Sequence, residues 1–273
     1  LLGAKAAMTA CRDAMAEVGR EVPIQTQVTI ELTGRMLPGT EIGAALVALD
    51  AMRPDVIGIN CATGPEEMSE HIRHLSAHSR IPISVLPNAG LPSVVDGHMH
   101  YDLSAEQFVD FHRRFLTEFG VNVVGGCCGT TPEYIRQLAE AVAEVEPTRR
   151  EPHFEHGVAS IYSPVLLEGD DTGGASNLIM IGERTNANGS KKFREAMLES
   201  DWDTCVAMAK EQVKEGSHII DVCVDYVGRD GAADMDGIAQ RFATQSSVPL
   251  VLDSTEPEVL EAGLRWLGGR AIL

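Results

Sequence analysis

The amino-acid sequence predicts an α/β protein built from repeated strand–helix units in two domains. Three observations support this fold class. Short apolar runs alternate with amphipathic helical periods along the 273 residues, aromatic residues make up only 5% of the chain, and one polar segment rich in Pro and Gly interrupts the alternation. Strands separated by helices pair in parallel, and small or branched side chains suit helix-on-sheet packing.

Four such units are predicted in the first half of the chain, after an initial helix over residues 4–18. The predicted strands are residues 24–32, 55–60, 83–87 and 121–126. Helices are predicted over residues 41–52, 66–77 and 104–119, and a fourth begins at residues 130–133, where a hydroxyl and a proline favour a helix start. In parallel units, functional residues are expected where strands end and loops begin.

A polar segment then separates this half from the next, with one short docked piece expected at residues 160–167. Further strands are predicted at residues 178–183, 218–224 and 249–254, and residues 270–273 begin a fourth. We therefore predict one domain over residues 1–146, a linker over residues 147–177 and a second domain over residues 178–273. A chain that stops inside a strand leaves that strand unpaired, so we interpret the sequence as a fragment.

Composition limits the partners that the chain can bind. The formal net charge is −18, and a polyanionic surface repels phosphate backbones and anionic lipids, so we expect neither nucleic acid nor membrane partners. The N-terminal residues lack the basic start and apolar core of a signal peptide. Six cysteines in a chain of this length do not make a disulfide framework. We therefore expect a soluble, cytoplasmic protein.

Three cysteines follow the ends of two predicted strands. Cys61 comes directly after residues 55–60, and Cys127 and Cys128 come directly after residues 121–126. Glycines around the adjacent pair permit a sharp turn, so both thiols can face one metal ion. Three thiolates around zinc leave one tetrahedral position open for a substrate thiol, which would lose its proton there. The alternative is that these cysteines are ordinary buried side chains; the pattern favours zinc.

The remaining candidate metal ligands are interpreted as structural. Cys11 and Cys205 fall on predicted helices and are assigned to packing, whereas the role of Cys223 stays open. His98 and His100 are placed in a loop. Three histidines at helical spacing are assigned to the surface: His71, His74 and His78.

Polar residues also follow the predicted strands of the second domain. Asn186, Gly189 and Ser190 belong to a turn that can present amides to a ligand. Lys191 opens the next helix, where a cation is unfavourable unless an anion binds there; a solvated lysine is the alternative. This turn therefore hints at a ligand that carries a carboxylate or a phosphate.

Acidic residues end the next two strands, with Asp221 and Asp225 on one and Asp253 on the other. A carboxylate at a strand end can accept two hydrogen bonds from an amino-imine edge, as guanine or a pterin presents. The run Asp253-Ser254-Thr255 can equally cap the helix that begins at residues 256–257, so both interpretations stay open.

Two sets of motifs resemble known families. The runs GINCATGP at residues 58–65 and GGCCGTTPE at residues 125–133 resemble the zinc motifs of the homocysteine S-methyltransferase family. The runs GERTNANGSKKF at residues 182–193, IIDVCVD at residues 219–225 and LDST at residues 252–255 resemble the pterin-binding domain of methyltetrahydrofolate methyltransferases. Both sets in this order resemble the cobalamin-dependent methionine synthase family, and the resemblance covers nearly the whole chain.

The resemblance implies two (βα)8 TIM-type barrels: the C-terminal half of a homocysteine-binding zinc barrel and the N-terminal half of a barrel that binds 5-methyltetrahydrofolate. Cys61, Cys127 and Cys128 would hold Zn²⁺ and activate homocysteine. The methyl group would pass from methyltetrahydrofolate through cobalamin, bound by a domain outside this chain, to homocysteine, giving methionine and tetrahydrofolate. Glu31, on the first predicted strand, is a candidate partner for the homocysteine amine. The implied pterin contacts are Asn186, Gly189, Ser190, Lys191, Asp221 and Asp253.

The chain departs from these families in several places. Cys223 stands where an Asn is frequent, and the next pterin-binding Asn would follow Leu273. Four strands of each barrel are absent, so we expect neither barrel to close and the chain alone not to turn over. Methionine formed by the isolated chain would refute that expectation.

Three other functions are alternatives. A cobalamin-free homocysteine methyltransferase with a sulfonium or betaine donor needs only the first domain, and methyltetrahydrofolate binding would argue against it. The second alternative is a non-catalytic fragment that binds zinc or serves as a scaffold. The zinc content of the purified chain would test it. A pterin synthase of the dihydropteroate type is the third, but it would need no cysteine cluster.

Overall fold

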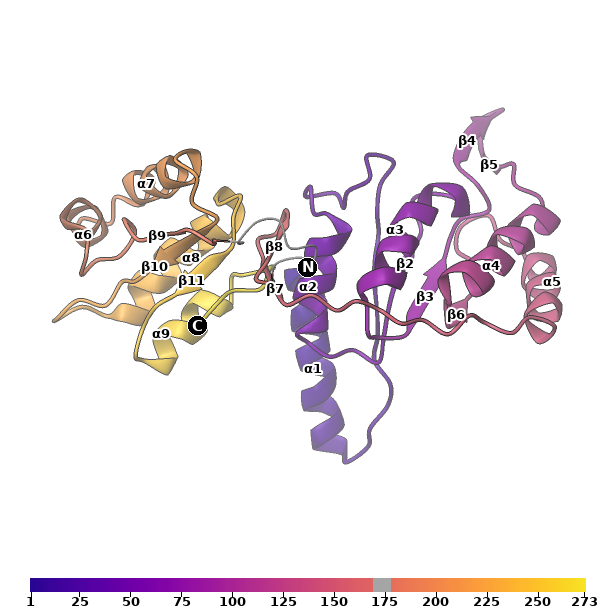
Figure 1. Ribbon diagram of the computed structural model, residues 1–273, viewed down its shortest axis with the longest axis horizontal. Helices are drawn as coiled ribbons and strands as arrows, with labels where there is room; N and C mark the ends of the chain where they lie inside the picture. The colour runs from indigo at the N-terminus through magenta and orange to yellow at the C-terminus, as the bar shows by residue number, and fades with distance from the viewer. Residues whose placement is uncertain (169–177) are drawn as a thin grey trace. The chain divides into compact units, whose positions relative to one another are not determined.

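The computed structural model describes residues 1–168 and 178–273, so residues 169–177 of the predicted linker lie outside the described residues. Two compact units make up the described chain (Figure 1). One, here called the thiol unit, comprises Ala7–Phe154; the other, here called the carboxylate unit, comprises Leu1–Ala6 with Glu155–Leu273. The boundary between residues 154 and 155 falls inside the predicted linker.

A four-stranded parallel sheet forms the centre of the thiol unit (Figure 1). Its strands follow one another in chain order: β1 (Gln25–Val28), β2 (Val56–Asn60), β3 (Ile83–Leu86) and β6 (Val123–Val124). Helix α1 (Leu2–Val18) precedes them, α2 (Ile42–Asp50), α3 (Pro65–His78) and α4 (Ala105–Phe119) connect them, and α5 (Pro132–Ala143) follows. Because neighbours in the sheet are also neighbours in the chain, the order has no switch point, as in a barrel wall.

Local sequence explains these elements. The β2 and β3 side chains Ile59, Ile83 and Val85 have no exposed surface, which is why these strands are mostly apolar in sequence. Helix α4 begins at a capping box, in which Ser104 and Gln107 each accept a backbone N–H of the other. These elements bring the carboxyl ends of β2, β3 and β6 to one edge of the sheet.

An antiparallel hairpin interrupts the connection between β3 and α4. It consists of β4 (Pro92–Val95) and β5 (His98–Tyr101), joined by Asp96 and Gly97 at φ angles of 51° and 78°. Two central residues at positive φ give the two-residue turn whose twist matches a hairpin. The placement of His98 and His100 in a loop is therefore wrong. The Asp-Gly pair between two β-rich runs was the signal for this hairpin.

A three-stranded parallel sheet in chain order forms the carboxylate unit: β9 (Ile181–Gly182), β10 (Ile219–Val222) and β11 (Leu250–Leu252). Four helices accompany it: α6 (Lys191–Leu198), α7 (Trp202–Lys214), α8 (Gly231–Gln245) and α9 (Pro257–Leu264). The predicted docked piece falls in a second hairpin, β7 (Gly157–Ala159) with β8 (Pro164–Leu166). The predicted last strand is reduced to isolated bridges, one joining Ile272 in parallel to Val251.

The α/β fold class with parallel sheets is thus confirmed, and neither sheet closes on itself within residues 1–168 and 178–273. Each of these strands is shorter than predicted, and the difference is largest for β1, β6 and β9. β1 ends at Val28 because the chain turns at Glu31, whose carbonyl accepts the N–H of Gly34 at 2.9 Å. β6 ends at Val124, before its glycine pair. None of the helices in the described ranges combines the length and apolar character needed to span a membrane.

Candidate metal centre and carboxylate cluster

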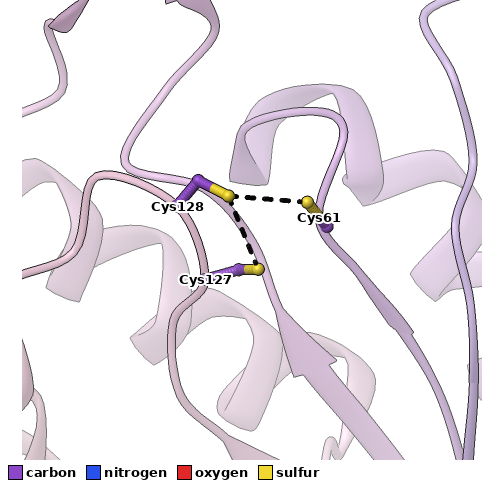
Figure 2. Close-up of side chains that lie close together, drawn as sticks. All are labelled: Cys61, Cys127 and Cys128. Atoms are coloured by element: carbon purple, nitrogen blue, oxygen red, sulfur yellow. Dashed lines mark hydrogen bonds between the residues drawn. The ribbon is translucent and has the colours of Figure 1, made fainter. Parts of the chain in front are cut away.

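The three predicted zinc ligands converge in the thiol unit. The Sγ atoms of Cys61 and Cys128 are 3.7 Å apart, and those of Cys127 and Cys128 are 3.9 Å apart (Figure 2). Zinc–sulfur bonds of about 2.3 Å in a tetrahedron separate the sulfurs by about 3.8 Å. The donor set therefore fits zinc. Within the described residues, no other group of three or more His, Cys, Asp or Glu side chains lies close enough to share a metal.

The backbone at Cys61 adopts a conformation that L-residues rarely occupy. Cys61 and Ala62 both have φ of 62°, and the N–H of Thr63 donates to the carbonyl of Cys61 at 2.8 Å. Non-glycine residues in this region carry of the order of 1 kcal/mol of strain each, and such residues cluster at functional sites. This tight turn aims the Cys61 thiol at the cysteines that follow β6.

The segment of residues 86–89, which begins at the last residue of β3, holds both cysteine loops. The carbonyl of Leu86 accepts the N–H of Cys61 at 3.1 Å, and the carbonyl of Pro87 accepts the N–H of Cys127 at 2.8 Å. The side-chain oxygen of Asn88, which is 2% exposed, accepts the N–H of Cys128 at 3.1 Å. Sequence reasoning missed Asn88, although a polar residue just after a buried strand is a signal of this kind of role.

The thiols influence one another and respond to Glu31. Burial acts to raise the pKa of Cys61, but the backbone N–H of Ala62 and the two other thiols outweigh it and lower the pKa. Burial and the neighbouring thiols raise the pKa of Cys127 to about 11. The carboxylate of Glu31 lies near enough to act on the Cys61 thiol. Glu31 itself lies three residues beyond the end of β1.

The other cysteines divide into buried and exposed. Cys205 has no exposed surface, so its assignment to packing is confirmed, whereas Cys11 is exposed and that assignment is wrong. Cys223 is 3% exposed and accepts a hydrogen bond from the Asn188 amide at 3.7 Å. Burial raises the pKa of Cys223 to about 11, which keeps it a neutral thiol.

In the carboxylate unit, side chains from three strand ends meet. The amide of Asn186 donates to Asp221 at 2.9 Å and to Asp253 at 3.3 Å. Its oxygen accepts the N–H of Gly189 at 3.2 Å, which ties the predicted turn to the cluster. Burial, with the nearby charge of Asp253 adding to it, raises the pKa of Asp221. The cluster has more acceptors than donors, so it favours a ligand that brings N–H groups.

The alternative role of Asp253 as a helix cap is not observed. Glu256 is the N-cap residue of α9 and makes no capping hydrogen bond with its own side chain, but the hydroxyl oxygen of Ser254 accepts the N–H of Glu256 at 3.1 Å. Ser254 also donates to Asp225 at 2.9 Å, and Asp253 faces Asn186.

Ser190 and Lys191 lie apart from this cluster. Ser190 caps α6, and the ammonium of Lys191 lies 3.6 Å from Glu195 on a side chain that is 78% exposed. Both residues, with Gly189, line a cleft of about 570 Å³ to which Asn186, Asp221 and Asp253 do not contribute. The structure thus gathers three of the six predicted pterin contacts, links Gly189 to them, and places two at the neighbouring helix start. Their binding roles stay predictions.

Comparisons with known proteins match both halves of the chain. The family model "Homocysteine S-methyltransferase" matches residues 1–142, and "Pterin binding enzyme" matches residues 182–273. The chain is 51% identical over its whole length to the methionine synthase of Mycobacterium tuberculosis (strain ATCC 25618 / H37Rv), and 50% identical to that of Mycobacterium leprae (strain TN). It spans 22% and 23% of these two relatives, about a fifth of their length.

Likeness to solved structures is slight. The carboxyl transferase domain of Rhizobium etli pyruvate carboxylase with pyruvate aligns over 93% of this chain and 39% of that one, at 13% identity and a TM-score of 0.28, which is too low to bear on the fold. The family match over residues 1–142 includes all three clustered cysteines. The chain therefore belongs to the homocysteine S-methyltransferase family.

Proposed function

We propose that the thiol unit holds zinc through Cys61, Cys127 and Cys128 and activates homocysteine as a methyl acceptor. The observation that carries this proposal is the separation of the sulfurs, 3.7 Å and 3.9 Å, which suits a tetrahedral thiolate site with one position left for a fourth ligand. Zinc in such a site would lower the pKa of an incoming thiol toward neutrality.

The chain's own residues would position the substrate. The segment of residues 86–89 fixes both cysteine loops from one side. The carboxylate of Glu31, whose charge acts on the Cys61 thiol, suits the homocysteine ammonium, because an opposite charge in the neighbourhood of the thiol site would orient the amino-acid end. This arrangement would hold the substrate sulfur toward the metal and its polar end away from it.

In the carboxylate unit, the proposed ligand is 5-methyltetrahydrofolate. Asp221 and Asp253 accept hydrogen bonds from one amide and retain acceptor capacity for the N–H-rich edge of a pterin. Asn186 orients both carboxylates while its oxygen holds the turn at Gly189. Contacts from Ser190 and Lys191 would belong to the more distant part of the folate.

In the proposed reaction, a methyl group would pass from methyltetrahydrofolate to homocysteine, giving methionine and tetrahydrofolate, and a cobalamin bound outside this stretch would supply the methyl-carrier chemistry between them. Support comes from the two relatives, each called methionine synthase, and from the order of the two family matches. The proposed domains are residues 1–146 and 178–273, joined by residues 147–177.

Two binding measurements on the purified chain test this function. Zinc content should be one ion per chain in the parent and should fall at least tenfold in Cys61→Ser, and calorimetry should detect methyltetrahydrofolate binding. A chain that holds zinc but fails to bind methyltetrahydrofolate would support a cobalamin-free methyltransferase instead. A chain that binds neither would support the non-catalytic alternative.

A further inference from the structure

A buried imidazole contacts the backbone that leads to Cys127 and Cys128. His112 lies on α4 and has no exposed surface. Its Nε2 atom is 3.0 Å from the carbonyl oxygen of Gly125, and its Nδ1 atom is 2.8 Å from the carbonyl oxygen of Phe108, one turn earlier in the helix. Gly125 is the first residue after β6. The ring therefore contacts the chain at the point where it leaves the sheet for the two cysteines.

The parallel ladder leaves the Gly125 carbonyl without its regular donor. β6 pairs in parallel with β3, and the N–H of Gly125 continues that pairing by donating to the carbonyl of Val85 at 3.2 Å. In this register the carbonyl of Gly125 would next accept the N–H of residue 87. That residue is Pro87, which has no N–H. A carbonyl inside the fold needs a donor, and His112 is placed to supply it.

The position of the ring proton decides which carbonyl receives a hydrogen bond. Burial lowers the pKa of His112, although both carbonyls act against it, so the neutral ring has one N–H for two acceptors. The Phe108 carbonyl lies within α4, where the backbone N–H of His112, four residues on, is its regular donor. Pro87 gives the Gly125 carbonyl no such donor. A proton on Nε2 therefore leaves fewer carbonyls unpaired than a proton on Nδ1.

Neighbouring contacts restrict both the ring and the backbone that it touches. The centre of the His112 ring lies 4.3 Å from that of Phe108 and 5.8 Å from that of Phe115, so packing fixes the orientation of the imidazole. A methyl group added at Gly125 would come within 2.6 Å of the Leu86 side chain. Gly125 is therefore held by β3 through its N–H and contacted by α4 at its carbonyl.

We propose that His112 is a positioning residue of the thiol cluster: its Nε2–H donates to the Gly125 carbonyl, replaces the donor that Pro87 lacks, and so fixes the backbone that carries Cys127 and Cys128. Ligands that are held in place before the metal arrives bind it more tightly than ligands that must first be ordered. This inference rests on the proposed zinc function, and it assigns a role to a residue of α4 that lies outside both cysteine motifs.

Two variants that retain different parts of the imidazole test the proposal. The amide nitrogen of Gln falls near the Nε2 position of His, whereas the amide nitrogen of Asn falls near Nδ1. We expect His112→Gln to bind zinc within about threefold of the parent affinity and His112→Asn to bind it about tenfold more weakly, as for the loss of an outer contact to a metal ligand. Competition with a chromogenic chelator measures both. Equal zinc affinities in the two variants would overturn the proposal.

Val109→Ala is the control for a loss of stability. Val109 is a buried residue of the same helix and packs in the same cluster as Phe108, and its side chain makes no hydrogen bond. Its truncation should lower the urea midpoint of the metal-free chain and leave zinc affinity at the parent value. A loss of zinc affinity as large as in His112→Asn would mean that His112 acts only through stability, against the positioning role.

The ring proton itself separates this inference from the proposed function. Nitrogen-15 NMR distinguishes a ring nitrogen that carries a proton from one that does not, and in the metal-free parent chain we expect the proton of His112 on Nε2. A proton on Nδ1 alone would contradict the role of His112 and leave the zinc function standing. A parent chain that has the Nε2 proton but binds no zinc would contradict the zinc function, and this inference with it.

Discussion

Cys61 reaches the cluster through backbone geometry that its residue type does not favour. Two successive non-glycine residues at φ of 62° are strained, and the hydrogen bonds from residues 86–89 hold the loop in place. Asn88 is the side chain in that segment that acts directly on a cysteine, through the N–H of Cys128. At the residue scale, the proposed metal site therefore depends on the polar contacts that hold the cysteine loops as well as on the thiols.

We predict that Asn88→Ala weakens zinc binding about tenfold. The substitution leaves the N–H of Cys128 without its acceptor, and loss of such an outer contact to a ligand commonly lowers metal affinity by 10- to 100-fold. Competition with a chromogenic chelator measures the change. Asn122→Ala is the control, because Asn122 accepts the N–H of Ile83 at the opposite end of the same strand. Equal losses in the two variants would mean that Asn88 acts only on stability.

A second prediction concerns the carboxylate cluster. Asp221→Asn should weaken methyltetrahydrofolate binding by about 10- to 100-fold, since a hydrogen bond to a charged partner contributes about 1.5–3 kcal/mol. Calorimetry measures the dissociation constant. Asp201→Asn serves as control, because Asp201 caps α7 and contacts none of the cluster. Unchanged binding in Asp221→Asn would remove this residue from the pterin site.

At the scale of elements, the patterns of apolar residues in the sequence predicted the parallel strands and the helices between them. Strands such as β2 and β3 could be predicted because they are buried on both faces, and a strand of that kind is mostly apolar in sequence. The β4–β5 hairpin was missed because its strands are exposed and lack the alternation of a half-buried sheet; Val94 is 71% exposed. The cysteines could be predicted from strand ends, but Asn88 could not, because its role depends on a contact between two loops.

Helix α3 shows a further difference from the sequence prediction. His71 and His74 were assigned to the surface, but both are half-buried, and the His74 and His78 rings lie 4.6 Å apart. Burial, with repulsion from His78 and His71, lowers the pKa of His74 from 6.5 to about 4. The folded thiol unit therefore favours neutral His74.

This shift predicts an acid-sensitive step in stability. Because the folded pKa is the lower one, the contribution of His74 is present above pH 6.5 and is lost as the pH falls toward 4. After allowance for its partial exposure, the loss should be about 1–2 kcal/mol. Urea unfolding of His74→Gln should show a shallower fall of the unfolding free energy across this range. His98→Gln, on the exposed hairpin, should follow the parent; a parallel course for all three proteins would contradict the assignment.

At the scale of the whole molecule, each site is contained within one compact unit. The thiols and the segment of residues 86–89 belong to Ala7–Phe154, and the carboxylate cluster belongs to the unit that includes Glu155–Leu273. No residue of either site comes from the other unit. The two binding functions should therefore be separable by mutation.

We predict a double dissociation between the two ligands. Cys127→Ser should lose zinc and keep methyltetrahydrofolate binding within twofold, and Asp253→Asn should do the reverse, because each change removes a group from one unit only. Zinc analysis and calorimetry on the same samples measure both. Loss of both ligands in either variant would mean that the substitution unfolds the chain or that the sites are coupled.

The ligation of the metal tests the central claim most directly. X-ray absorption at the zinc edge, on the purified chain with one zinc per molecule, should show three sulfurs at about 2.3 Å and one lighter ligand. Added homocysteine should raise the sulfur count to four, since the fourth position is the proposed substrate site. A metal shell without three sulfurs, or a sulfur count that homocysteine leaves unchanged, would contradict the account.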